Sequence, residues 1–178
     1  MGNAIRILPH YTYEDYKRWE GKWEILYGVP YAMSPAPSPK HQVISTRLIV
    51  AFSNQLEKCE KCIVLQPVDY LVSDDIILQP DILIVCKPIE KKLLDFPPVL
   101  VVEVLSPSTA MKDRHNKYEI YQAQGIKYYI IVDPDLQEAE VYVLTDGEYK
   151  MTVKGKDIQH SFLLEECTAD IDFKEIWK

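Results

Sequence analysis

The chain has 178 residues, of which 47% are hydrophobic and 26% are charged, and its formal net charge is −7. This length and composition predict a folded protein, and we expect residues 1–178 to form a single domain. No apolar run approaches the roughly 18 residues of a membrane span, so neither a membrane protein nor a disordered chain is expected. The acidic charge argues against a broad basic surface for nucleic acid, so such binding would need a local basic patch or metal ions.

The N-terminal residues lack the apolar stretch of a signal peptide, so we expect a cytoplasmic protein whose four cysteines are reduced. Cys59 and Cys62 form a lone C-x-x-C pair. Zinc binding would require about four ligands, and only Cys167 and His160 would be left to complete the set at long range. Separate, half-buried thiols are therefore the expectation, and a zinc site or a redox pair is the alternative.

The first half of the chain carries the signals of two helices and several strands. In chain order, the expected elements are a helix over 12–20, a strand–turn–strand over 23–33, a helix over 38–58, and strands over 63–72 and 76–86. The long helix is well marked, because Ser38 suits an N-cap, Pro39 suits the first helical position, and apolar residues recur along one face.

The second half predicts a strand over 98–105, a helix over 109–123, a strand over 127–132, a hairpin over 140–153 and a short helix from Asp170. The first of these strands is almost continuously apolar, which is typical of a strand covered on both faces. The passage from Val99 to Val132 has the length of a right-handed crossover, so its two strands should be parallel. The whole order predicts an α/β protein with a mixed β-sheet flanked by helices and additional hairpins.

Two acidic residues occupy positions where buried strands should be apolar. Asp81 opens an apolar strand directly after Pro80, and Glu103 lies inside the apolar run over 99–105. An unpaired carboxylate in such a place is costly, so a cation or a raised pKa must compensate. A magnesium ion held by both carboxylates would do so. The simpler alternatives are a turn or capping role for Asp81 and a buried ion pair for Glu103.

Asp113, Lys117 and Tyr121 are spaced four residues apart, which places them on one face of the helix that follows the Glu103 strand. The helix starts near the C-terminal end of that strand, so Lys117 could reach the two acids. An ammonium group there can stabilise the charge that develops during attack on a phosphate. The simpler alternative is an exposed Asp113–Lys117 pair with little effect on stability.

Several of these segments resemble the Uma-type family, described as putative restriction endonucleases, within the PD-(D/E)XK restriction-endonuclease-like superfamily. The segments that carry the resemblance are Trp23–Gly28, Pro80–Val85, Val101–Ser108, Asp113–Tyr121 and Tyr128–Pro134. The similarity extends over about residues 10–178. It implies a central mixed sheet flanked by helices, a divalent metal that is usually magnesium, and hydrolysis of a phosphodiester bond.

The resemblance also implies roles for individual residues. Asp81 and Glu103 would bind the metal, and the backbone carbonyl of Val104 could be a further ligand. Glu24 and His41 match polar positions that recur in the family near the site.

The lysine of the superfamily normally lies two residues after the glutamate, but Leu105 occupies that position in this sequence. The resemblance moves the ammonium group to Lys117 on the following helix, with Lys112 as the spare candidate. The inward orientation of a lysine on this helix is therefore a specific expectation.

The sequence thus predicts a metal-dependent nuclease that hydrolyses DNA with Mg²⁺ or Mn²⁺. The alternative is a catalytically inactive protein with the same fold that acts as a nucleic-acid-binding or assembly module. A small-molecule enzyme with a cysteine or histidine nucleophile is disfavoured, because the histidines are scattered along the chain. The predicted hairpin edges suggest pairing across a two-fold axis, so a homodimer is expected.

Overall fold

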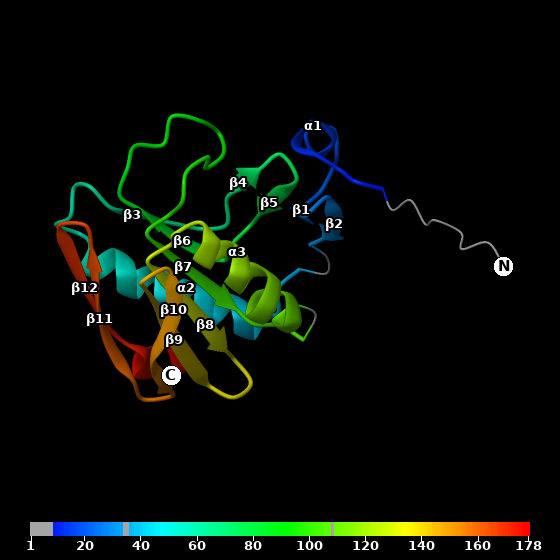
Figure 1. Ribbon diagram of the computed structural model, residues 1–178. Helices are drawn as coiled ribbons and strands as arrows, with labels where there is room; N and C mark the ends of the chain where they lie inside the picture. Colours follow the sequence, from blue (N-terminus) through cyan, green and yellow to red (C-terminus); the bar gives the residue numbers. More distant parts are fainter. Residues whose placement is uncertain (1–8, 34–35, 108) are drawn as a thin grey trace.

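The computed structural model describes residues 9–33, 36–107 and 109–178, and these form three β-sheets with helices packed against them (Figure 1). Residues 1–8, on which the expectation about a signal peptide rests, and Ser108 of the family motif lie outside this range. The strands are β1 Trp23–Leu26, β2 Val29–Ala32, β3 Ile63–Leu65, β4 Tyr70–Ser73, β5 Ile76–Leu78, β6 Ile82–Val85, β7 Leu100–Val104, β8 Tyr128–Asp133, β9 Glu138–Thr145, β10 Glu148–Gly155, β11 Gln159–Leu164 and β12 Cys167–Asp172.

The helical segments are α1 Tyr13–Tyr16, α2 Pro39–Gln55, a π-helix over Lys112–Lys117, α3 Tyr118–Ala123 and a 3-10 helix over Phe173–Trp177. The start of α2 is as predicted, because the Ser38 hydroxyl accepts a hydrogen bond from the His41 amide at 3.2 Å. Within the described ranges, no helix combines the length and the apolar character that crossing a bilayer demands.

The central element is a six-stranded sheet with the strand order β10-β9-β8-β7-β6-β3. Strands β7 and β8 are parallel, as the crossover length predicted, and the other pairings in this sheet are antiparallel. All five residues of β7 are buried, which confirms the expectation of a strand covered on both faces. The mixed α/β fold predicted from the sequence is therefore the observed one.

The two faces of this sheet pack against different layers (Figure 1). One face carries Val102 and Ile130 and packs against α2 and the β11–β12 hairpin. The other face carries Val101 and Tyr129 and packs against α3 and the four-stranded sheet β2-β1-β5-β4. Strand alternation puts Glu103 on the second face, so its carboxylate points toward the helix that follows β7.

Each of the two strands expected over 63–72 and 76–86 is in fact two separate strands. Pro67 and Pro80 explain the breaks, because proline cannot donate the backbone hydrogen bond that a continuous ladder requires. As a result β3 and β6 join the six-stranded sheet, whereas β4 and β5 join the four-stranded one. The break at Pro80 leaves Asp81 directly before the first residue of β6.

The short helix expected at the C-terminus is present as a 3-10 helix over Phe173–Trp177, but its capping residue is Asp172 and not Asp170. Residues 159–172 form the β11–β12 hairpin, and the 3-10 helix begins only after Asp172, which caps it. The buried residues alternate along both strands, with Phe162 and Leu164 on β11 and Ala169 and Ile171 on β12. This period-two pattern outweighs the capping signal of a single aspartate.

The expectation of four separate thiols is also wrong. The cysteines form two disulfides, Cys59–Cys167 and Cys62–Cys86. The register Ile63↔Val85 between β3 and β6 sets Cys62 opposite Cys86, a proximity that no local pattern in the sequence reveals.

Candidate active site

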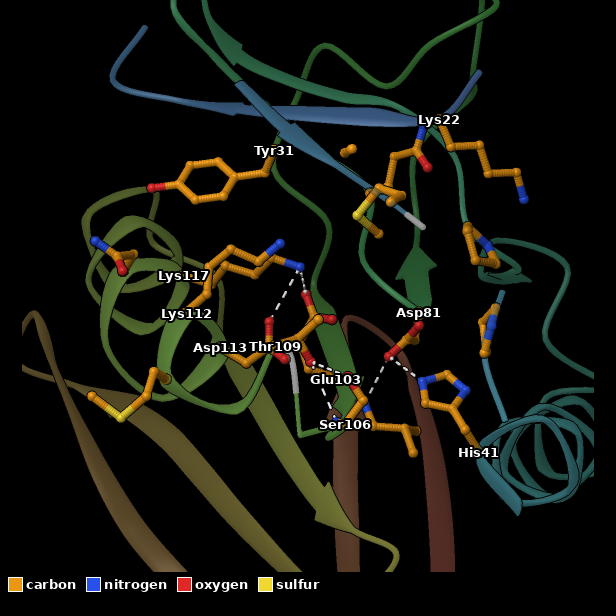
Figure 2. Close-up of a pocket in the computed structure, with 18 residues that line it drawn as sticks. Lys22, Tyr31, His41, Asp81, Glu103, Ser106, Thr109, Lys112, Asp113 and Lys117 are labelled. Carbon is orange, nitrogen blue, oxygen red and sulfur yellow. Dashed lines mark hydrogen bonds and ion pairs between the residues drawn. The ribbon is translucent and has the colours of Figure 1, made fainter. Parts of the chain in front are cut away.

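A pocket of about 430 Å³ opens where β7 ends, between the β1–β2 hairpin, the start of α2 and the π-helix (Figure 2). Its lining includes most of the residues that the sequence singled out. These are His41, Asp81, Glu103, Val104, Lys112, Asp113 and Lys117. Residues from four separate segments of the chain thus converge on one pocket.

Asp81 is fixed at the end of β7 by its neighbours. One oxygen of its carboxylate accepts a hydrogen bond from the Val104 amide at 2.8 Å and lies 3.2 Å from His41 Nε2. The register Ile82↔Val102 between β6 and β7, extended by one residue, sets Asp81 opposite Glu103. The two acids therefore reach the same pocket from adjacent strands (Figure 2).

Glu103 is 2% exposed, and one of its carboxylate oxygens accepts two hydrogen bonds. The donors are the Lys117 ammonium at 2.8 Å and the Tyr121 hydroxyl at 2.7 Å. Burial raises the pKa of Glu103 well above its ordinary value, although the charge of Lys117 opposes this rise. Leu105, which occupies the usual lysine position of the superfamily two residues later, is buried in the apolar core and offers no charge.

Lys117 points inward and contacts three carboxylates. Its ammonium lies 2.8 Å from Glu103, 2.8 Å from Glu24 and 3.4 Å from Asp113. Lys117 and Asp113 are each 2% exposed, so the alternative of an exposed surface pair does not hold. Burial opposes the charge on Lys117, but the three carboxylates raise its pKa well above the ordinary value.

Glu24 is fully buried in β1 and lies between the two lysines of the site. One of its oxygens contacts Lys117 and accepts a hydrogen bond from the Gln79 amide at 2.9 Å, and the other pairs with the Lys112 ammonium. Burial alone would raise the pKa of Glu24, but Lys117 and Lys112 together lower it. Both candidate lysines thus reach the site. Lys112 also lies 5.4 Å from the centroid of the Tyr31 ring, in cation–π range.

His41 lies in the first turn of α2, where the Ser38 cap holds its backbone. Burial opposes protonation of its ring, but hydrogen bonding to Asp81 and to the backbone of Val104 raises its pKa. His41 therefore contacts two of the three groups that the resemblance assigns to a metal.

We refer to Glu24, Asp81, Glu103 and Asp113 as the acidic cluster. Glu24, Glu103 and Asp113 contact the ammonium groups of Lys112 and Lys117, whereas Asp81 pairs with His41. With all four carboxylates ionised and His41 neutral, negative charges exceed positive ones by two. Burial raises the pKa of Asp113, and its Oδ1 atom has no hydrogen-bond partner among the described residues. The excess charge matches that of one divalent cation.

Sequence reasoning missed several residues that line the pocket, among them Lys22, Tyr31 and Thr109. Lys22 and Tyr31 belong to the same hairpin as Glu24. Glu24 could have pointed to them, because a hairpin that carries a buried site residue also brings the neighbours of that residue to the site.

The family model of Uma2, described as "Putative restriction endonuclease", matches residues 13–171. With this fold and this site in place, the chain belongs to the Uma2 family. Its resemblance to that family, stated from sequence motifs, is thereby confirmed.

Two further proteins are similar to this chain. An uncharacterized protein from Synechocystis sp. is 33% identical over 154 residues, which cover 78% of this chain and 77% of that protein. The crystal structure of a putative nuclease belonging to DUF820 from Anabaena variabilis has a TM-score of 0.75 at 16% identity, and the match covers 93% of this chain and 97% of that one. The second similarity establishes the shared fold.

Proposed function

We propose that this protein is a metal-dependent nuclease that hydrolyses phosphodiester bonds of DNA. The observation that carries the proposal is the meeting of Asp81 and Glu103, from adjacent strands, in a pocket that also holds Lys117. Membership of a family described as "Putative restriction endonuclease" supports the same reaction class.

The residues present fit a hard divalent cation such as Mg²⁺ or Mn²⁺. Asp81, Glu103 and the carbonyl of Val104 would supply oxygen ligands only, which these ions prefer, and the acidic cluster has the matching charge excess. When bound, the cation would neutralise charge on phosphate oxygens and activate water for attack.

The surrounding side chains position these ligands. Lys117 and Tyr121 hold one oxygen of Glu103 by hydrogen bonds, and the Val104 amide and His41 hold one oxygen of Asp81. Lys117 also brings a fixed positive charge to the pocket, where it stabilises negative charge that develops on the phosphate. Lys112, whose side chain is 12% exposed, is the more accessible of the two ammonium groups.

Cleavage of plasmid DNA in Mg²⁺ or Mn²⁺ tests the proposal. We expect the parent protein to nick or linearise the plasmid, Asp81→Asn to lose the activity, and Asp135→Asn to retain it. Asp135 is the matched control, because its side chain is 79% exposed and lies outside the pocket lining. A parent protein that leaves the DNA intact with either ion would refute the proposal.

The second candidate function is a non-catalytic module for nucleic-acid binding or assembly, which the net charge of −7 and the full engagement of Lys117 by carboxylates favour. Calorimetry separates the two. A nuclease binds Mg²⁺ in a manner that depends on Asp81, whereas a module that has lost the reaction binds no Mg²⁺ at this pocket.

We also propose that the protein works in the cytoplasm as a single-domain homodimer. The outer strand β10 has eight residues, and none of the described strands pairs with its outer edge, so a second copy could extend the sheet there across a two-fold axis. A dimer would suit cleavage of both DNA strands. Light scattering that gives a monomer at micromolar concentration would remove the dimer from the proposal.

A further inference from the structure

A second group of chemically reactive side chains lies well away from the pocket. Cys59 follows α2, Cys62 precedes β3, Cys86 follows β6 and Cys167 opens β12. Asp81 and Cys86 flank opposite ends of β6, so at 3.3 Å per residue the cysteine group lies about 16 Å from the metal ligands proposed above. The proposed nuclease reaction uses none of these sulfur atoms.

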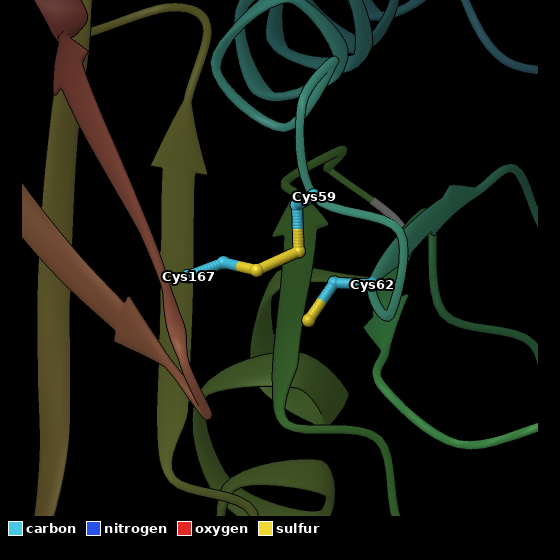
Figure 3. A group of neighbouring side chains, drawn as sticks. All are labelled: Cys59, Cys62 and Cys167. Carbon is cyan, nitrogen blue, oxygen red and sulfur yellow. A yellow bond between two sulfur atoms is a disulfide. The ribbon is translucent and has the colours of Figure 1, made fainter.

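The four sulfur atoms are gathered in one place. The Sγ atoms of Cys59, Cys62 and Cys167 all lie within 4.8 Å of one another, and the Sγ of Cys86 is bonded to that of Cys62. Figure 3 shows the Cys59–Cys167 bond with the Cys62 sulfur directed toward it. Four cysteine sulfur atoms from three segments of the chain thus form one group, with Cys86 attached to it through its bond to Cys62.

We infer that these four cysteines bind one zinc ion when they are reduced. A tetrahedral zinc tetrathiolate has Zn–S bonds of about 2.3 Å, which sets its sulfur atoms about 3.8 Å apart. The sulfur atoms of Cys59, Cys62 and Cys167 lie within 4.8 Å of one another, and once both disulfides are reduced each bonded pair has only to separate to that spacing. Cys59 and Cys62 have the C-x-x-C spacing by which one loop supplies two zinc ligands.

An ion pair already joins two of the segments that carry the cysteines. Lys61 pairs with Glu166 at 2.6 Å, which ties the Cys59–Cys62 loop to the turn that precedes Cys167. A soft tetrahedral sulfur site selects zinc over the hard cations proposed for the pocket.

Formation of the zinc site requires that both disulfides first be reduced, and a small dithiol can supply the electrons and protons. Two dithiol molecules reduce the two disulfides, transferring four electrons and four protons, and are themselves oxidised to two disulfides. Zinc then displaces the four thiol protons and forms four Zn–S bonds, which leaves a site with a net charge of −2.

Such a site would tie together elements that are far apart in sequence. It would link the end of α2, the β3–β6 edge of the central sheet and the C-terminal hairpin. The β11–β12 hairpin also packs against this body through apolar residues such as Phe162 and Ile171. The inferred role of the zinc ion is therefore structural. It is tested by measuring zinc binding and protein stability rather than DNA cleavage.

The test uses the full chain, reduced with a dithiol and handled without oxygen. We expect one zinc per chain by elemental analysis, and a loss of titratable thiols when equimolar zinc is added. We also expect cobalt substitution to give the thiolate charge-transfer and ligand-field bands of a tetrahedral tetrathiolate. Oxygen ligands in the pocket give no thiolate band, so the signal is specific to the cysteines.

Cys86→Ser should lose the tetrathiolate spectrum, whereas His160→Gln, which removes the other soft ligand suggested by the sequence, should keep it. Circular dichroism of both variants checks that they fold. Four freely titratable thiols in the reduced parent protein in the presence of zinc, with no thiolate–cobalt band, would overturn the inference without reference to any variant.

Discussion

The Lys117 ammonium lies 2.8 Å from the Glu103 carboxylate, although the two residues belong to different elements and are 14 positions apart. In the pattern of the superfamily the lysine follows the glutamate by two residues, but here Leu105 takes that position and packs into the core. The helix after β7 supplies the charge instead. Its first part is a π-helix, a rare conformation that is frequent at functional sites.

Replacement of Lys117 by methionine should strongly destabilise the protein. The substitution leaves three carboxylates buried around a missing ammonium group, and removing one partner of a buried ion pair costs roughly 3–5 kcal/mol. Lys112→Met is the matched control, because Lys112 is more exposed and its ion pair is with Glu24 alone. Urea unfolding measures both losses. If the two variants lose the same free energy of unfolding, Lys117 does not have the central position that its three carboxylate contacts indicate.

Mg²⁺ should stabilise the folded protein through the acidic cluster. A ligand that binds only the folded state adds about 2.7 kcal/mol at a free concentration 100 times its Kd. Thermal unfolding with and without Mg²⁺ measures this effect, and a chelator should reverse it. Asp81→Asn should abolish the shift and Asp135→Asn should preserve it. A shift that survives in Asp81→Asn would place the ion elsewhere.

The pKa of Glu103 should give the metal-free protein a characteristic pH dependence. Burial raises this pKa in the folded state, so the folded protein retains a proton that the unfolded chain loses above its pKa of about 4.3. Stability should therefore fall as the pH rises from that value through the folded pKa.

The uncharged Glu103→Gln variant should have a flatter profile. Urea unfolding from about pH 5 to about pH 8 in the presence of a chelator compares the two proteins. If the stability of the parent protein and of Glu103→Gln changes with pH in the same way, the pKa of Glu103 is not raised by its burial. Mg²⁺ competes with the proton for this carboxylate, so its stabilising effect should grow as the pH rises.

Glu140 should contribute stability with the opposite pH dependence. Burial opposes its ionisation, but hydrogen bonds from Tyr142, Lys154 and Arg114 lower its pKa. This contribution is present above the unfolded pKa and is lost as the pH falls through the folded one. Glu140→Gln should cost roughly 1.5–3 kcal/mol at neutral pH and less at about pH 3. Glu138→Gln, at a less buried position of the same strand, is the control.

The acidic residues of the site could be predicted because burying a carboxylate in an apolar strand is unfavourable, and such a position is visible in the local sequence. A carboxylate in an apolar run must be compensated, so Asp81 and Glu103 stood out, and helical spacing joined Asp113, Lys117 and Tyr121 on one face. The parallel pairing of β7 and β8 followed in the same way from the length of their connection. The strand breaks at prolines were missed because the apolar runs on both sides of each proline indicated longer strands. The hairpin over 159–172 was not predicted at all.

The amino-acid sequence by itself determined the class of fold, the family and the residues that could not be buried without a partner. Only the tertiary structure decided which residues are the partners of those buried groups. Glu24 lies between Lys112 and Lys117, and Cys86 lies opposite Cys62, because separate sheets and strands pack side by side. Periodicity and spacing describe neighbours within a turn or a strand. Contacts between distant segments depend on sheet register and layer packing, which become defined only when the whole chain has folded.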